Sequence, residues 1–285
     1  MDRFKLWNWS TSFATSVPEP PSSLNPDERP PILATRLNFA EYGLPEYQNR
    51  YALVIDNLFT EEDCERLLAL VPRGGDSSSN TGDKAVGGAW PAAVLDETFF
   101  DPNYRNGGRI VRNEPDIAAW ILEKIRPYIR DIEEIPDAHQ HRSLRKWRSR
   151  LAESEPEDAN AVRPARLRGL REDLRFLQYC PGHFFKPHED AVHKDEERNE
   201  LSYYTLQLYL SGESKTLKGG ATRFWPKSTV DGRASQGRYV DVESRMGRVL
   251  IFEQRDLRHS GQEVKEGVKY NIRADMMYVE VDKPE

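Results

Sequence analysis

The C-terminal half of the sequence is a succession of short segments with the composition of β-strands. From Leu174 onward, runs rich in β-branched and aromatic residues are separated by turns that contain Gly, Pro or Asp. The expected strands are Leu174–Tyr179, Tyr203–Leu210, Ala221–Trp225, Tyr239–Val242, Arg248–Phe252 and Lys269–Val279. A series of short strands without an internal repeat is typical of a β-barrel or sandwich.

The N-terminal half adds two amphipathic helices. A strand is expected at Tyr51–Ile55, and a helix begins after Thr60, which is followed by three acidic residues that suit the positive end of a helix dipole. Its apolar stripe consists of Cys64, Leu67, Leu68 and Val71. A second helix follows Pro115, and its apolar face is Ile117, Trp120, Ile121, Ile125 and Ile129. Helices followed by strands indicate an α+β fold in which the helices cover one face of the β-structure.

The chain of 285 residues is long enough for one large domain or two small ones. We expect residues 1–48 to form an extended arm, because prolines prevent regular structure before Leu37, and residues 49–285 to form a single domain. Residues 72–108 are rich in Gly, Ser, Asn and Asp, as in a long functional or disordered loop. Residues 136–172 form a charged, arginine-rich connector. It is a candidate surface for nucleic acid or an acidic partner, but a solvated surface is the preferred interpretation.

Composition argues against several classes of protein. No run approaches the roughly 20 apolar residues that a membrane span needs, and the N-terminus lacks a basic segment followed by an apolar one. Two cysteines, Cys64 and Cys180, cannot form a disulfide framework or a Cys-rich zinc site. With 47 acidic and 41 basic side chains the formal net charge is −6, which weakens a nucleic-acid interpretation. We therefore expect a cytoplasmic or nuclear protein that does not bind membranes.

Three residues far apart in the sequence form a candidate metal site. In an extended segment, residues two apart project to the same side, so His188 and Asp190 converge while Glu189 points away. His259 lies 69 residues after Asp190, just beyond an expected strand. Two imidazoles and one carboxylate on one face of a metal leave three positions open, which is the arrangement of non-haem Fe(II) oxygenases.

A basic residue follows the three candidate ligands at a position that suggests a role in the same site. Lys269 begins an expected strand ten residues after His259, and Asn271, Arg273 and Asp275 share its face. An inward-facing lysine needs an anionic partner, because an unpaired buried ammonium is costly. A dicarboxylate cosubstrate that chelates iron at one end would supply that partner at the other. Arg273 either contacts the same ligand or pairs with Asp275 or a surface acid, and both readings stay open.

Several ordered motifs together carry a family resemblance. They are Tyr179-Cys-Pro-Gly-His-Phe-Phe-Lys-Pro-His188-Glu-Asp190, Thr205-Leu-Gln-Leu-Tyr209-Leu, Gly219-Gly-Ala-Thr222-Arg-Phe, Gly247-Arg-Val-Leu-Ile-Phe252 and His259-Ser-Gly-Gln-Glu-Val-Lys-Glu-Gly-Val-Lys269. Over about residues 174–280 the sequence resembles the 2-oxoglutarate/Fe(II) dioxygenases of the prolyl 4-hydroxylase type. The resemblance implies a double-stranded β-helix (jelly-roll) core, supported by the N-terminal helices.

The same resemblance implies the cofactors and the roles of individual residues. Iron would be held by His188, Asp190 and His259. Lys269 would bind the distal carboxylate of 2-oxoglutarate, with Tyr209 beside it and Tyr179 lining the same pocket. Phe185 falls where relatives often carry a tyrosine, and Thr205 and Thr222 are expected only as pocket walls. Fe(II), 2-oxoglutarate and O2 are thus the expected cofactors, with ascorbate as a candidate addition.

The reaction expected from this resemblance is hydroxylation of an unactivated C–H bond, with succinate and CO2 as coproducts. The leading substrate is a prolyl or other side chain in a protein or peptide, and residues 72–108 with Arg112 and Asn113 would form a lid or substrate wall. The alternative is a free amino acid, small metabolite or natural product. A nucleic-acid oxygenase and a non-catalytic binding module rank lower. The oligomeric state stays open. His183 and His193 are expected at the rim, and His139 and His141 in the solvated connector.

Overall fold

The strands of the protein form two main sheets. The computed structural model describes residues 14–17, 29–72, 90, 101–136, 164–212, 216–227 and 238–281. In the larger sheet the strand order is β2 (Leu33–Arg36), β3 (Ala52–Asp56), β15 (Val249–Glu253), β11 (Glu200–Tyr209), β18 (Lys269–Glu280), β7 (Ala165–Leu170) and β6 (Glu134–Ile135). From this path β8 (Asp173–Tyr179) branches on β18, β5 (Gly108–Asn113) on β8, and β10 (Lys194–Asp195) on β11.

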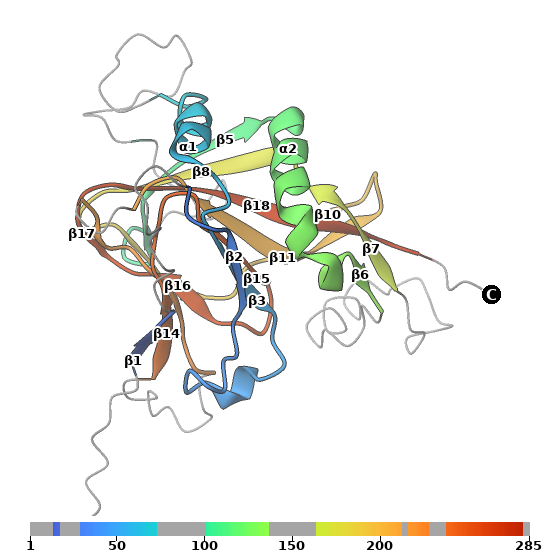
Figure 1. Cartoon of the computed structure of the whole chain (residues 1–285), viewed down its shortest axis with the longest axis horizontal. Coiled ribbons are helices and arrows are strands. Elements are labelled where there is room, and N and C mark those ends of the chain that lie inside the picture. Colours follow the sequence, from blue (N-terminus) through green and yellow to red (C-terminus); the bar gives the residue numbers. More distant parts are fainter. Residues whose placement is uncertain are drawn as a thin grey trace, which may run out of the picture.

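The smaller sheet carries both candidate histidine ligands, His188 and His259. Its order is β1 (Ala14–Ser16), β14 (Tyr239–Val242), β13 (Thr222–Phe224), β16 (His259–Gly261), β9 (Phe184–His188) and β4 (Arg105–Asn106). A separate pair joins β12 (Lys218–Gly219) to β17 (Val264–Glu266). The two sheets form the jelly-roll core expected from the sequence. The two α-helices, α1 (Glu61–Leu68) and α2 (Pro115–Ile125), lie together over the larger sheet (Figure 1).

The two-residue period of the strands explains why the larger sheet contributes side chains to two hydrophobic cores. In β3, Leu53 and Ile55 pack with the helices, whereas Ala52 and Val54 belong to the cluster between the sheets. Strands β11 and β18 follow the same rule on the helix side, with apolar residues such as Leu206 and Ile272. Their alternate residues include buried polar side chains, such as Thr205, Lys269 and Asn271, which point into the jelly-roll interior.

The helices begin where the sequence predicts. Thr60 caps α1: its hydroxyl accepts from the backbone N–H of Asp63 at 3.1 Å, while the Asp63 carboxylate accepts from the N–H of Thr60 at 3.0 Å. Pro115 is the first residue of α2, where its missing N–H costs nothing. The α2 pattern continues into short 3₁₀ turns at Arg126–Tyr128 and Arg130–Ile132, and Ile129 between them is buried as expected.

Parts of the sequence fold into more structure than we expected. The prolines do not prevent structure before Leu37, because Leu33–Arg36 pairs antiparallel with β3. Residues 37–47 include the 3₁₀ turn Pro45–Tyr47, and Phe39 and Tyr47 are fully buried between the sheets. The end of the charged connector forms β7, which pairs with β18.

Neither α-helix in the described part of the chain has the length and apolar character to cross a membrane.

Two expected segments lie largely outside the described residues. In the 72–108 loop, residues 73–89 and 91–100 lie outside the described part of the chain. In the connector, residues 137–163 lie outside it, and they include His139 and His141. The structure describes three connector arginines, and each pairs with an acid: Arg166 with Glu134, Arg168 with Glu200, and Arg171 with Asp173.

Candidate metal centre

Two strands and one turn bring the three candidate ligands together. His188 ends β9, Asp190 follows two residues later, and His259 begins β16, directly opposite His188 in the antiparallel register. One ligand atom from each residue lies within 4.8 Å of the others. Nε2 of His188 is 3.7 Å from Oδ1 of Asp190, and Nε2 of His259 is 3.7 Å from Oδ2. Glu189 points elsewhere, and its carboxylate accepts from the N–H of Asp256.

Both imidazoles are held in the tautomer that a metal ligand requires. Nδ1 of His188 lies 2.7 Å from the Lys186 carbonyl oxygen, and Nδ1 of His259 lies 3.0 Å from that of Leu257. A carbonyl oxygen can only accept, so each Nδ1 is the donor, and Nε2 is the nitrogen that carries the lone pair in the neutral ring. Such outer hydrogen bonds orient metal-bound histidines.

The Asp190 carboxylate is buried and held by two donors. The Thr205 hydroxyl donates to Oδ2 at 2.6 Å, and the Arg273 guanidinium lies 3.1 Å from Oδ1. Burial alone would raise the pKa of Asp190, but Arg273 and the two neighbouring histidines outweigh it and hold that pKa well below its usual value. The carboxylate is therefore ionised, as a metal ligand must be.

Aromatic rings surround the two histidines. Phe185 stacks on His188 with ring centroids 3.6 Å apart, and Phe252 packs edge-on against His259 at 4.6 Å. Burial, assisted by His188, lowers the pKa of His259 to about 4. His259 is thus neutral at pH 7 and can bind a metal ion without first losing a proton.

Lys269 occupies another part of the same interior. It is buried at the start of β18, and its Nζ donates to the Gly220 carbonyl at 2.6 Å. Nζ lies 5.2 Å from the ring centre of Tyr209 and 5.6 Å from that of Tyr179. No carboxylate of the described residues lies within ion-pair distance of it, and burial lowers its pKa to about 8. Gly220 has φ of +76°, and a Cβ there would lie 3.3 Å from the lysine side chain, so glycine keeps the approach open.

The other residues expected at the site divide into two groups. Tyr209 shares a 2.7 Å hydrogen bond with Thr222, and Tyr179 lines the cavity. Arg273 pairs with Asp275 at 3.3 Å as well as with Asp190, and it also lines the cavity, so its contact with 2-oxoglutarate stays a prediction. His183 and His193 lie outside the cluster of three ligands.

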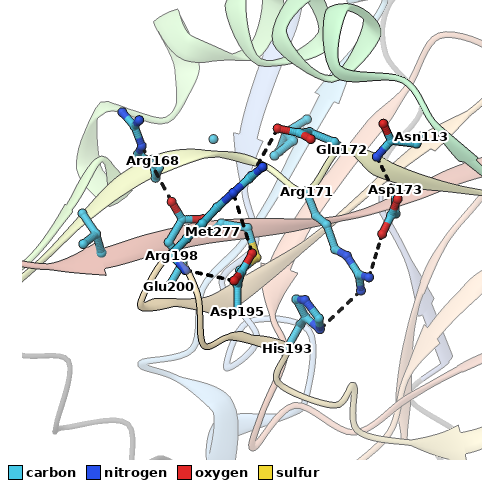
Figure 2. Close-up of a pocket in the computed structure, with 13 residues that line it drawn as sticks. Asn113, Arg168, Arg171, Glu172, Asp173, His193, Asp195, Arg198, Glu200 and Met277 are labelled. Carbon is cyan, nitrogen blue, oxygen red and sulfur yellow. Dashed lines mark hydrogen bonds and ion pairs between the residues drawn. The ribbon is translucent and has the colours of Figure 1, made fainter.

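The cavity between the sheets measures about 40 Å³. Its walls are Arg105, Leu177, Tyr179, Phe185, His188, Asp190, Gln207, Thr222, His259, Ser260, Gly261, Gln262, Lys269, Asn271 and Arg273. It thus joins the three candidate ligands to the candidate cosubstrate lysine. A larger depression of about 800 Å³ lies where β7, β8, β10 and β11 meet, away from these residues, and its charged side chains pair with one another (Figure 2).

Sequence reasoning missed two contributors to the site. Thr205 was expected only as a wall but donates directly to Asp190. The alternation of β11 carries the signal, because Thr205, Gln207 and Tyr209 share one face. Arg105 reaches the cavity from β4, a two-residue strand too short for any sequence pattern to reveal. Arg112, expected in a lid or substrate wall, bonds to Glu114 in an exposed position, and that expectation stays a prediction.

Comparison with known proteins agrees with this geometry. Residues 174–274 match the family model of the 2OG-Fe(II) oxygenase superfamily, a span that contains all three candidate ligands, Lys269 and Arg273. Two imidazoles and one ionised carboxylate also fit the donor set that Fe(II) takes in oxygenases. This region therefore defines a non-haem iron oxygenase. The match indicates an oxygenase of the 2OG-Fe(II) type over these residues, with Fe(II), 2-oxoglutarate and O2 as the cofactors.

Solved structures show looser likenesses. A viral collagen prolyl hydroxylase from Paramecium Bursaria Chlorella virus-1 is 14% identical, with a TM-score of 0.39 over 81% of this chain and 97% of that one. A prolyl-4-hydroxylase of Pseudomonas putida is 14% identical, with a TM-score of 0.41 over 82% and 96%. A prolyl hydroxylase of Trichoplax adhaerens, in complex with a peptide fragment, is 13% identical, with a TM-score of 0.39 over 66% and 70%. No curated protein matches the chain. At these TM-scores the likenesses carry no argument about substrate.

Proposed function

We propose that the protein hydroxylates an unactivated C–H bond, with Fe(II) held by His188, Asp190 and His259. The observation that carries this proposal is the convergence of one ligand atom from each residue within 4.8 Å, with both Nε2 atoms left free by carbonyl-bound Nδ1 atoms. When bound there, Fe(II) with 2-oxoglutarate and O2 supplies the oxidising chemistry: one oxygen atom enters the C–H bond, the other enters succinate, and CO2 leaves.

Lys269 is the residue we assign to the distal carboxylate of 2-oxoglutarate. Its ammonium is buried, has a carbonyl oxygen as its hydrogen-bond acceptor, and shares a cavity with the three ligands. A carboxylate placed beside it would offset the cost of burying the charge. We assign Tyr209 and Tyr179 to the walls of the same cosubstrate site, since both rings lie within 6 Å of the ammonium.

Arg273 acts on the site through Asp190. Its guanidinium bridges that carboxylate and Asp275, so it restricts the orientation of the ligand and holds it in the ionised form. Thr205 fixes the other oxygen of Asp190. The two donors leave the carboxylate little freedom to rotate, which prepares it for a metal ion.

The substrate we put first is a prolyl or other side chain in a protein or peptide, and the alternative is a free amino acid, small metabolite or natural product. We propose residues 49–285 as the oxygenase domain, onto which residues 33–47 pack. The test incubates purified protein with Fe(II), 2-oxoglutarate and ascorbate and measures succinate. His188→Ala and Asp190→Ala should abolish its formation, whereas His183→Ala should not. Succinate formed equally by all of these variants would refute the proposal.

A further inference from the structure

The metal cavity and the sheet face beside it carry more positive charge than the cosubstrate needs. Lys269 is assigned to 2-oxoglutarate, but Arg105 and Arg273 also line the cavity. Arg109 and Arg175 lie on the adjoining face of β5 and β8. The described acids that pair with this group are Asp190 and Asp275, and they pair with Arg273 and Arg175. Arg105 and Arg109 are therefore left without a carboxylate partner among the residues that the structure describes.

The strand register places Arg109 on the cavity side of the larger sheet. Arg109 lies opposite Leu177 across β5 and β8, and Leu177 lies opposite Asn271 across β8 and β18. Residues paired across neighbouring strands face the same side. Because Leu177 and Asn271 line the cavity, Arg109 continues the same face outward along β5.

Arg105 approaches from the other sheet. Its guanidinium carbon lies 4.6 Å from the ring centre of Phe185, and the same ring stacks on His188. The Nε atom of Arg105 is buried and has no hydrogen-bond partner. Arg273 also has a buried Nε without a partner. Buried guanidinium donors are usually satisfied, so these atoms indicate a missing acceptor.

The charges around Arg109 also indicate a missing anionic partner. Burial and the neighbouring charges of Arg105, Arg175 and Arg273 lower the pKa of Arg109. In the larger depression, by contrast, the arginines have carboxylate partners: Arg198 pairs with Glu172 and Arg171 with Asp173 (Figure 2). Cations that repel one another across a cavity are a typical site for an anion.

We propose that Arg105 and Arg109 bind an acidic group of the substrate, a carboxylate or a phosphate, beside the metal centre. The proposal rests on the proposed function, because it assigns the substrate class of that same site. Planar guanidinium groups suit both anions, which they bind through paired hydrogen bonds. The oxidised C–H bond then belongs to an anionic molecule or to a peptide with an acidic or phosphorylated residue nearby.

The experiment titrates simple anions into the full chain under anaerobic conditions with saturating Fe(II) and 2-oxoglutarate. Inorganic phosphate and acetate are the probes, ionic strength is held with NaCl, and binding is followed by calorimetry. Saturating 2-oxoglutarate keeps the probes away from Lys269. We expect saturable binding, weakened about tenfold or more in Arg105→Gln and in Arg109→Gln, as the loss of a charge-assisted hydrogen bond predicts. Arg109→Lys, which keeps the charge, should lose less.

Arg112→Gln is the matched control, because Arg112 lies on the same strand but bonds to Glu114 in a more exposed position. It should bind both probes as the unaltered protein does. No saturable binding of either probe, or equal binding in Arg109→Gln and Arg112→Gln, would overturn the proposal. The charge-transfer absorbance of the Fe(II) and 2-oxoglutarate complex is recorded in the same samples. Its absence counts against the proposed function, whereas normal absorbance with no anion binding counts against the anion site alone.

Peptide pairs then distinguish a carboxylate from a phosphate as the source of the anion. Both peptides of a pair have the same length and one proline. In one pair the proline is flanked by glutamate or by glutamine, in the other by phosphoserine or by serine, and free glutamate is compared with free glutamine. Succinate formed above the substrate-free rate is the measurement. Stimulation confined to the carboxylate members or to the phosphorylated members supports the proposal, and stimulation by the neutral members to the same extent contradicts it.

Discussion

Replacing Lys269 with methionine should have opposite effects on stability and on cosubstrate affinity. In the ligand-free protein, burial lowers the pKa of this lysine from 10.5 to about 8. One pKa unit corresponds to about 1.4 kcal/mol, so keeping the ammonium charged at pH 7 destabilises the folded protein by roughly 3 kcal/mol. Losing the hydrogen bond from Lys269 to the Gly220 carbonyl should destabilise the variant by about 1 kcal/mol. Lys269→Met should therefore raise the free energy of unfolding by about 2 kcal/mol.

The sign of the pH dependence follows from linkage. Between pH 8 and 10.5 the unfolded chain still binds the proton that the folded protein has lost, so stability rises with pH in this window. The advantage of Lys269→Met is present below pH 8 and disappears as the pH approaches 10.5. Urea unfolding of the metal-free protein at several pH values measures it.

Cosubstrate affinity should move the other way. Removing one partner of a buried charge pair costs about 2–5 kcal/mol, which is a loss of roughly 30-fold to 4,000-fold in affinity for 2-oxoglutarate. Calorimetry with Fe(II) under anaerobic conditions measures that loss. A variant that is less stable than the parent at pH 7, or that binds 2-oxoglutarate normally, would refute this assignment of Lys269.

Further predictions concern the ligand shell and the core. Affinity for 2-oxoglutarate should fall about tenfold for each pH unit above 8, as Lys269 loses its proton, and Lys269→Arg should abolish this dependence over the same range. Thr205→Val should weaken metal binding about 10-fold to 100-fold in a Co(II) titration, while Thr205→Ser should bind normally. Arg248→Leu should cost about 3–5 kcal/mol of unfolding free energy because it leaves the Asp56 carboxylate buried and unpaired, and equal stability of parent and variant would contradict this. Thr60→Ala should cost about 1 kcal/mol by removing the cap of α1, with Thr60→Ser close to the parent in thermal unfolding.

Local patterns in the sequence were enough to predict much of the fold. Tyr239–Val242 forms a strand with the predicted bounds, and Thr60 caps its helix as expected. The two-residue period of β18 placed Lys269 and Arg273 on one face, and the structure has both in one cavity. These predictions succeed because they depend only on propensity and on the alternation of a single strand.

The remainder depends on how distant strands meet. Leu33–Arg36 becomes a strand only because β3 offers it an edge, and no property of its own sequence outweighs the prolines around it. The contact between Thr205 and Asp190 joins an inner face of β11 to a turn after β9, and it exists only when both sheets are in place. The role of Arg105 likewise follows from its pairing opposite Phe185. Such contacts belong to tertiary packing, which a single sequence does not display.

We propose that His188, Asp190 and His259 together hold one ferrous ion. Anaerobic Fe(II) titration of the full chain with 2-oxoglutarate present tests this assignment, read by the charge-transfer absorbance and by metal content. We expect one iron per chain, lost in His188→Ala, Asp190→Ala and His259→Ala but retained in the control His193→Ala. Iron bound with unchanged stoichiometry by the three ligand variants, or lost in the control to the same degree, would contradict the account.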